Sequence, residues 1–253
     1  MTLVWRPGFQ FDTDASTYIE AVEAADTQAL ETGVRYAIND FVIGCKQDGI
    51  WSAIKASCIL AGARTLAGAL VPLVGTAPTN FNFVAGDYNR ETGLVGDGST
   101  KYLGSNRNNN ADAQDNQHVS VYASNYTSTT QYLIGGGANN PGASNIGYNS
   151  GSFYRSRNNS SITGVGSNVP GFIGISRAGS SSFFGRNTSV TAAYLSTSQT
   201  PANAGISVFA SDVQTGARSN SRLAFYSIGE SLNLALLDAR VTDLINAFGA
   251  AIP

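Results

Sequence analysis

The sequence predicts a mainly β protein: an antiparallel jelly-roll β-sandwich with an N-terminal helical extension and a C-terminal helix. Residues 13–57 carry apolar side chains at helical spacing. From residue 58 onward, short apolar or alternating runs recur at roughly ten-residue intervals with Gly, Asn, Ser and Pro between them, which is typical of sandwiches and barrels. Residues 234–248 return to a helical pattern. With 253 residues, 42% of them hydrophobic, the chain is long enough to bury one sizeable core.

The N-terminal region is expected to form helices. The first begins near residue 13, where Asp12, Thr13 or Asp14 would cap it. Asp26 is a second candidate N-cap, and the apolar stripe that follows it predicts a helix with one buried face: Leu30, Val34, Ile38, Phe41 and Val42. Gly44 and Gly49 interrupt this stripe, and residues 49–55 are expected to add a further turn or two of helix.

The middle of the chain is expected to contain many short strands separated by turns. The segment 93–99 is interpreted as tight turns, because Gly and Asp adopt positive φ at little cost. The predicted strands are residues 58–61, 69–74, 81–84, 101–103, 118–123, 132–135, 152–155, 171–175, 182–184, 205–210 and 223–228.

A closing helix is predicted after Asn233, a suitable N-cap. Asp238, Arg240 and Asp243 are expected mainly on the opposite face from the apolar stripe formed by Leu234, Leu237, Val241, Leu244, Ile245 and Phe248. The predicted organisation is therefore an arm with helices at 1–57 and a sandwich with its closing helix at 58–253, with no flexible linker.

Cysteine, histidine and acid usage argues against most catalytic chemistry. Cys45 and Cys58 are expected to be buried free thiols, and His118, the single histidine, a polar residue of a strand. Residues 116–211 contain four arginines and no Asp or Glu. Paired carboxylates for glycoside hydrolysis and carboxylate ligands for calcium therefore cannot come from this stretch alone. We expect no enzyme, no cofactor and no metal site; a polysaccharide lyase, which works without paired acids, is the remaining enzymatic alternative.

Charge and hydropathy exclude two classes of partner. A net charge of −2 and a pI near 5.3 argue against nucleic acid, whose binding proteins carry a basic footprint. No apolar run approaches the roughly 20 residues that span a bilayer.

Four segments resemble one family of modules. Residues 49–63 (Gly-Ile-Trp-Ser-Ala-Ile-Lys-Ala onward), 92–103, 116–122 and 222–232 resemble successive segments of the laminin-G-like (concanavalin-A-like) jelly-roll modules found in tailed-bacteriophage virion proteins. The resemblance covers about residues 35–250. It implies a virion structural protein, assembled in the host cytoplasm with other virion proteins as partners. The acid-free middle departs from calcium-dependent lectins of this architecture.

The first functional hypothesis is a fibre or tail-associated adhesin that binds host-surface polysaccharide. Aromatic and Asn residues alternate between 104 and 205, and flat rings with amide groups suit sugars. Arginines would pair with anionic groups. The candidate carbohydrate-binding residues are Tyr126, Tyr132, Tyr148, Tyr154, Arg155 and Arg157. The competing interpretation is that these aromatic residues form core and cross-strand pairs.

The second hypothesis is a capsid or tail decoration protein with a structural role. Trp5, Phe9 and Phe11 lie in a segment too broken by Pro and Gly to fold alone, so it would dock on a neighbouring subunit. A homo-oligomer, for example a trimer, would bury the helical stripe Leu30, Val34 and Ile38. The alternative is that the arm packs against its own domain.

Overall fold

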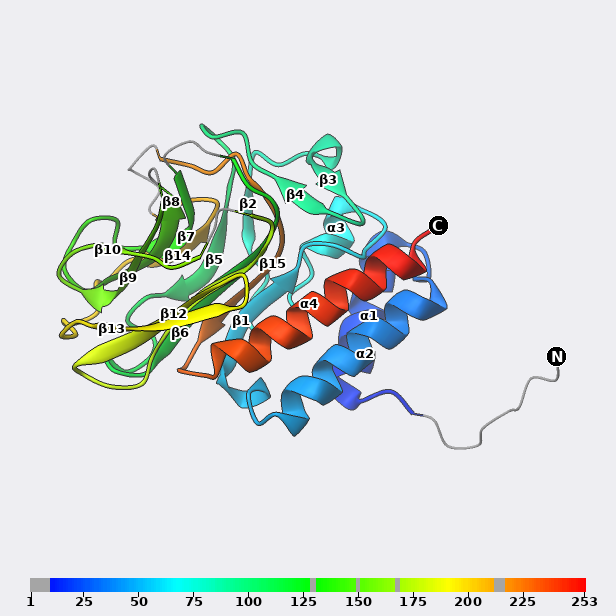
Figure 1. Ribbon diagram of the computed structural model, residues 1–253. Helices are drawn as coiled ribbons and strands as arrows, with labels where there is room; N and C mark the ends of the chain where they lie inside the picture. Colours follow the sequence, from blue (N-terminus) through cyan, green and yellow to red (C-terminus); the bar gives the residue numbers. More distant parts are fainter. Residues whose placement is uncertain (1–9, 128–130, 149–150, 167–168, 212–216) are drawn as a thin grey trace.

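Two antiparallel sheets packed face to face make up most of the molecule, and a layer of helices lies against one of them (Figure 1). The computed structural model describes residues 10–127, 131–148, 151–166, 169–211 and 217–253. The prediction of a mainly β sandwich with N-terminal helices and a C-terminal helix is confirmed.

The first sheet has eight strands and carries the helices. Its strands follow the order β13-β12-β11-β6-β15-β4-β3, and β1 pairs with the other end of β15. Their bounds are β13 (Val190–Leu195), β12 (Ser182–Asn187), β11 (Gly171–Arg177), β6 (Gln117–Asn125), β15 (Arg222–Gly229), β4 (Gly93–Val95), β3 (Tyr88–Asn89) and β1 (Ile54–Ile59).

The second sheet has seven strands and no helical cover. Their order is β10 (Ile162–Thr163), β9 (Ser152–Asn158), β8 (Ala143–Tyr148), β7 (Gln131–Gly136), β14 (Gly205–Val208), β5 (Tyr102–Asn108) and β2 (Thr79–Phe81). Directly opposite residues of an antiparallel ladder point to the same face of the sheet. Leu103, Val208, Ile134, Ile146 and Tyr154 form one such row and face the sandwich core.

The neighbouring row faces outward and is made of small and polar residues. Thr79, Gly104, Ser207, Gly135 and Asn145 follow one another across β2, β5, β14, β7 and β8. Ser207, Gly135 and Asn145 in this row are buried, so other segments cover the outer face at β14, β7 and β8.

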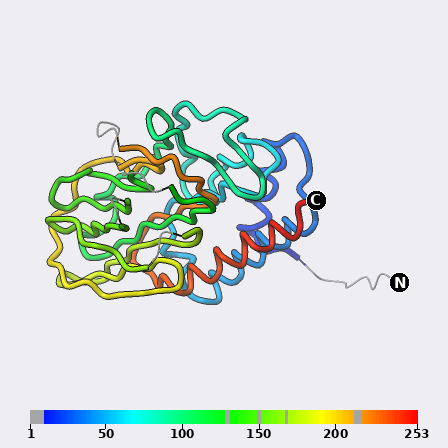
Figure 2. The backbone as a smooth tube through the Cα atoms, turned by 45° about the horizontal axis from the view of Figure 1, so that its top comes forward, coloured from blue at the N-terminus to red at the C-terminus, as the bar shows by residue number. Residues whose placement is uncertain are grey.

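The helices α1 (Thr13–Asp26), α2 (Thr32–Gln47) and α4 (Leu234–Ala251) cover the outer face of the eight-stranded sheet, and α4 runs beside α2 (Figures 1 and 2). Phe41 of α2 meets Phe225 of β15 edge-on at 5.8 Å between ring centroids. Helix and sheet side chains thus form one continuous second core, separate from the core between the sheets.

This packing corrects the predicted oligomer surface. Leu30, Val34 and Ile38 are 5%, 0% and 3% exposed, because they face the chain's own sheet and helix α4. They are not available to a neighbouring subunit. Phe11 lies 5.4 Å from the ring of Tyr36 of α2, whereas Trp5 and Phe9 lie outside the described residues.

The helix ends show which capping predictions hold. Asp12 caps α1 through Asp14 N, and Asn233 caps α4 through Ala235 N, as predicted. Asp26 is not an N-cap: it ends α1, and Glu31 precedes α2. The prediction for Asp238 was also wrong: its side chain is buried in an ion pair with Arg186 at 2.7 Å instead of facing solvent.

Several short elements differ from the prediction. After Gly49 the chain forms only the 3-10 turn η1 (Trp51–Ala53) before β1 starts at Ile54. The predicted strand 69–74 is replaced by the short helix α3 (Leu66–Ala69) and a turn, with one bridge from Val74 to Ser57. Residues 93–95 form β4, and η2 (Ala85–Asp87) precedes β3. Strands β3, β8, β10 and β13 were not predicted.

Candidate functional site

The six predicted carbohydrate-binding residues lie mostly inside the molecule. Tyr154 is fully buried, Arg157 and Arg155 are 1% and 7% exposed, and Tyr132 and Tyr148 expose less than a tenth of their surface. Tyr126 is half-buried. Residues placed this way do not offer ring faces or guanidinium groups to a surface glycan, so the structure corrects this set.

The tyrosines instead form aromatic pairs with other rings of the chain. Tyr154 meets Tyr194 edge-on at 5.8 Å between centroids, and Tyr132 meets Phe153 in the same way at 5.3 Å, across Gly147 of the strand between them. Tyr126 and Tyr148 pair at 6.3 Å. Burial raises the pKa of Tyr154 well above its usual value. These side chains contribute to packing.

The buried arginines bind backbone carbonyls. Arg155 donates to the carbonyls of Asn139, Asn140 and Asn159. Arg157 donates to those of Asn109 and Ala113, and burial lowers its pKa to about 10.

Arg177 is the third buried arginine that binds backbone carbonyls, and it has four of them as acceptors. It donates to Ser156, Gly179, Ser182 and Ser196. A desolvated guanidinium needs acceptors, and in a stretch without Asp or Glu the backbone carbonyls supply them.

His118 and the two cysteines have the structural roles predicted for them. His118 is fully buried on β6, between the carbonyl oxygen of Glu230 at 2.5 Å and Ser227 Oγ at 2.7 Å. Cys45 and Cys58 are free and buried, and burial raises the pKa of each thiol to about 12. Within the described part of the chain, no group of three or more His, Cys, Asp or Glu side chains is placed to hold a metal ion.

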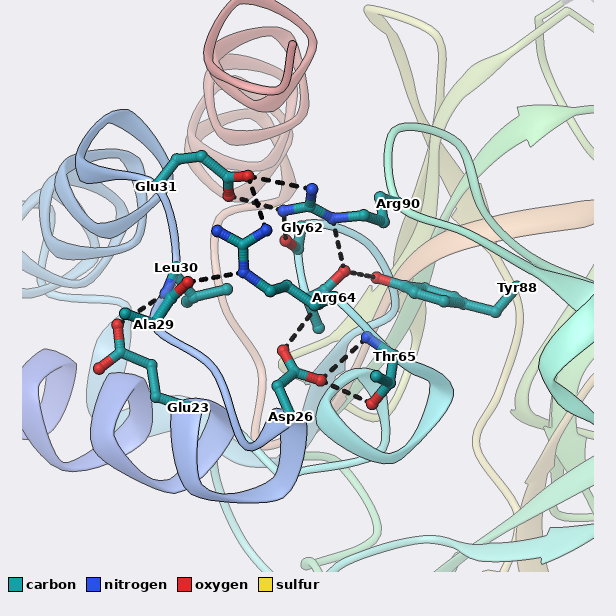
Figure 3. Close-up of polar contacts among 11 residues, drawn as sticks. Glu23, Asp26, Ala29, Leu30, Glu31, Gly62, Arg64, Thr65, Tyr88 and Arg90 are labelled. Atoms are coloured by element: carbon teal, nitrogen blue, oxygen red, sulfur yellow. Dashed lines mark hydrogen bonds and ion pairs between the residues drawn. The ribbon is translucent and has the colours of Figure 1, made fainter.

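A polar cluster joins the helices to the sandwich (Figure 3). The Glu31 carboxylate accepts hydrogen bonds from both terminal nitrogens of Arg90, at 3.0 and 2.6 Å, and forms an ion pair with Arg64 at 3.2 Å. These arginines hold the pKa of Glu31 below its usual value, with the Arg90 hydrogen bonds the main cause. Asp26 accepts the backbone N–H groups of Arg64 and Thr65 and the Thr65 hydroxyl.

Tyr88 also belongs to this cluster. Its hydroxyl donates to the carbonyl of Ala63 at 2.7 Å, and burial raises its pKa far above neutrality. Because both carboxylates and both arginines are engaged with protein groups, the cluster connects α1 and α2 to the loop at 62–65 and has no group free for a substrate.

An open groove of about 280 Å³ lies on the outer face of the seven-stranded sheet. Residues from β2, β5 and β14 line it: Thr79, Phe81, Tyr102, Gly104, Ser105, Asn106, Arg107, Asn108, Gly205, Ile206 and Ser207. Strand register brings these three segments together, since Thr79 pairs with Gly104 and Gly104 with Ser207.

One wall of the groove is aromatic. Phe81 stacks on Tyr102 at 4.2 Å between centroids and 7° between planes, and the Arg218 guanidinium lies 4.8 Å from the Tyr102 ring. Phe81 remains 37% exposed, one of the few large apolar side chains at the described surface to do so. Gly104 and Gly205 have no side chain to fill the space between this wall and the opposite rim.

The opposite rim is polar and neutral overall. Asn106 and Asn108 are exposed, and Asn106 Nδ2 donates to the Ala77 carbonyl at 2.8 Å and to Thr79 Oγ1 at 3.1 Å, which fixes the edge strand β2. Arg107 is paired with Asp112 through two contacts. No carboxylate is among the described residues that line the groove.

Sequence reasoning placed a strand at 81–84 but did not find this site. The signals were present: Phe81 in a polar context, Gly104 directly after the predicted strand 101–103, and Gly205 within the predicted strand 205–210. Strand register brings these residues together in space, and register could not be predicted from the sequence.

Fold and groove together define a β-sandwich with an open, aromatic-walled groove on the sheet that carries no helices. No protein-family model and no curated protein matches the chain. Among solved structures, domain 4 of an extracellular GH43 arabinanase from Geobacillus stearothermophilus, in complex with arabinotriose, is similar at 13% identity and a TM-score of 0.39, covering 66% of this chain and 82% of that one.

Two further structures are similar at comparable levels. A Trypanosoma rangeli sialidase mutant displaying trans-sialidase activity shares 10% identity at a TM-score of 0.41, over 83% of this chain and 39% of that one. An arabinofuranosidase complexed with arabinofuranosyl-alpha-1,2-xylobiose shares 12% sequence identity at a TM-score of 0.35, and the match covers 77% of this chain and 43% of that one. Likeness at this level does not indicate a shared function. None of the described helices is long and apolar enough to cross a membrane.

Proposed function

We propose that this protein is a non-catalytic glycan-binding protein that uses the groove on its seven-stranded sheet, and that it is displayed on a bacteriophage particle. The observation that carries the binding function is the exposed Phe81 ring, held flat by stacking on Tyr102, beside a floor of glycines. A rigid ring with one free face contacts the C–H face of a sugar at low entropic cost.

The chemistry of the groove supports binding without catalysis. Glycoside hydrolysis usually needs two carboxylates on either side of the bond, and no carboxylate is among the described lining residues. The hydrogen-bonding groups there are amides and hydroxyls of Asn106, Asn108, Thr79 and Ser207, which suit sugar hydroxyls. The virion setting rests on the sequence resemblance described above.

Truncation of Phe81 tests the binding function. The protein is applied to an array of oligosaccharides, and the affinity for the best ligand is measured by calorimetry. Phe81→Ala is expected to weaken binding roughly tenfold or more, because a stacked ring contributes on the order of 1 kcal/mol beyond its buried area. Val84→Ala is the matched control, since Val84 is 60% exposed but does not line the groove.

Two outcomes would contradict the proposal. Absence of binding to any oligosaccharide would favour the decoration role, in which the sandwich is only structural. Equal binding by Phe81→Ala and Val84→Ala would place the ligand away from the groove. Gold labelling of purified particles tests the virion setting separately, and its absence from particles would remove that part of the proposal.

A further inference from the structure

The groove also indicates which class of glycan it binds. We infer that it takes an electrically neutral sugar residue and discriminates against uronic and other acidic sugars, and that Asp112 sets this preference through Arg107. This inference rests on the proposed glycan-binding function and adds the ligand's charge class to it.

The first observation is the state of the cation at the groove. Arg107 is the cationic side chain among the described lining residues, and it is already neutralised by Asp112. Arg107 Nε lies 3.3 Å from Asp112 Oδ2, and Arg107 Nη2 makes a second contact with Oδ1. This two-point pairing uses the fork of the guanidinium that an incoming carboxylate would otherwise occupy.

The second observation is the fixed position of Asp112. Its side chain is 7% exposed, against 21% for Arg107, so the ion pair is partly shielded from solvent. A sugar carboxylate entering the groove would meet a paired cation beside a fixed negative charge. It would lose hydration without gaining an ionic partner, which is unfavourable.

The remaining lining favours neutral hydroxyls. Thr79, Asn106, Asn108 and Ser207 carry both donors and acceptors, which match a hydroxyl better than a carboxylate, an acceptor only. Nearby Lys101 is paired with Asp87 at 2.5 Å. Arg218, which lies beside the Tyr102 ring, donates to the Ser99 carbonyl. The cations Arg107 and Lys101 are thus held in internal ion pairs.

A comparison of matched ligands tests the charge class. The best neutral oligosaccharide from the array and the same compound oxidised to carboxylates at C6 are titrated into the wild-type protein. The neutral compound is expected to bind roughly tenfold or more tightly, the factor that corresponds to one lost charge-assisted contact. The affinity for the neutral compound should change little between about 50 and about 500 mM NaCl. This range changes the Debye length severalfold, and screening by salt weakens only interactions between charges.

Asp112→Asn tests the role of the ion pair. This isosteric change releases Arg107, and the ratio of acidic to neutral affinity is expected to rise roughly tenfold. A thermal unfolding curve of the variant confirms that the fold is intact. An unchanged ratio in a folded variant would overturn the role of Asp112, and stronger binding of the acidic compound to the wild-type protein would overturn the inference while leaving glycan binding in place.

A groove-filling variant assigns the binding to this groove. A Cβ added at Gly205 meets only Asn108 Oδ1 within 4 Å, at 3.9 Å, so Gly205→Val is expected to fold and to block the groove. Gly249→Val on the exposed side of α4, where an added Cβ meets nothing, is the control. If both variants bind the neutral compound equally, the inference fails because the sugar lies elsewhere, although the protein still binds glycans.

Discussion

The single buried histidine makes the stability of this protein sensitive to pH in a defined range. His118 is the only histidine in the chain, and it is 0% exposed. A carbonyl oxygen only accepts, so Nδ1 carries the proton and donates it to Glu230, and Nε2 accepts from the Ser227 hydroxyl. Burial lowers the pKa of His118 to about 4, because a charged imidazolium would be desolvated there.

The sign and size of the effect follow from the two pKa values. The unfolded chain has an imidazole pKa of about 6.5, so between pH 6.5 and 4 the unfolded state binds more protons than the folded state. Stability therefore falls as pH falls through this range. The loss is about 2 kcal/mol between pH 7 and pH 5 and approaches about 3 kcal/mol below pH 4.

The assay is urea unfolding of the wild-type protein and His118→Gln at pH 7, 6 and 5. At pH 5 the carboxyl groups, which titrate near 4 in unfolded chains, contribute little, so the loss should be present in the wild type and absent from the variant. The imidazole signal in an NMR titration gives a second measurement. An equal loss in both proteins, or an imidazole that titrates near pH 6.5 in the folded state, would refute the reasoning.

Two further predictions concern the polar interior and the junction in Figure 3. Arg177→Met should lower the free energy of unfolding by about 3 kcal/mol or more, because four backbone carbonyls lose their donor. Arg35→Met, at the more exposed ion pair with Glu23, should cost less in the same urea titration. Glu31→Gln should cost roughly 1–2 kcal/mol, since it breaks the pairs with Arg64 and Arg90, and Glu91→Gln at an exposed site should be neutral; equal costs would show that the junction adds no stability.

The helices and most strands could be predicted because each has a local signal. The apolar stripe after Asp26 fixed the buried face of α2, and alternation fixed β6. The prediction that this stripe is an oligomer surface was wrong, because an apolar helix face requires a packing partner but does not specify which one. Here the partner is the chain's own eight-stranded sheet.

The candidate site could not be predicted in the same way. Tyrosine and arginine in an acid-free, Asn-rich stretch suit both a sugar-binding surface and a buried polar interior. The difference depends on whether loops cover the sheet, and loop cover is a long-range property. Strand β8, ASNIGY, was missed for the same reason: its polar residues are buried by other segments, so it lacks the alternation that marks a half-exposed strand.

Arg157, one of the residues predicted to bind sugar, is connected to the groove through the backbone. Arg157 donates to the carbonyl of Asn109, whose own amide donates to the Ala204 carbonyl at 2.9 Å and whose side chain donates to the Gly142 carbonyl at 2.9 Å. Asn108 and Gly205, the adjacent residues, form the polar end of the groove. The buried Arg157 guanidinium thus fixes, through Asn109, the two segments that carry Asn108 and Gly205 in the groove.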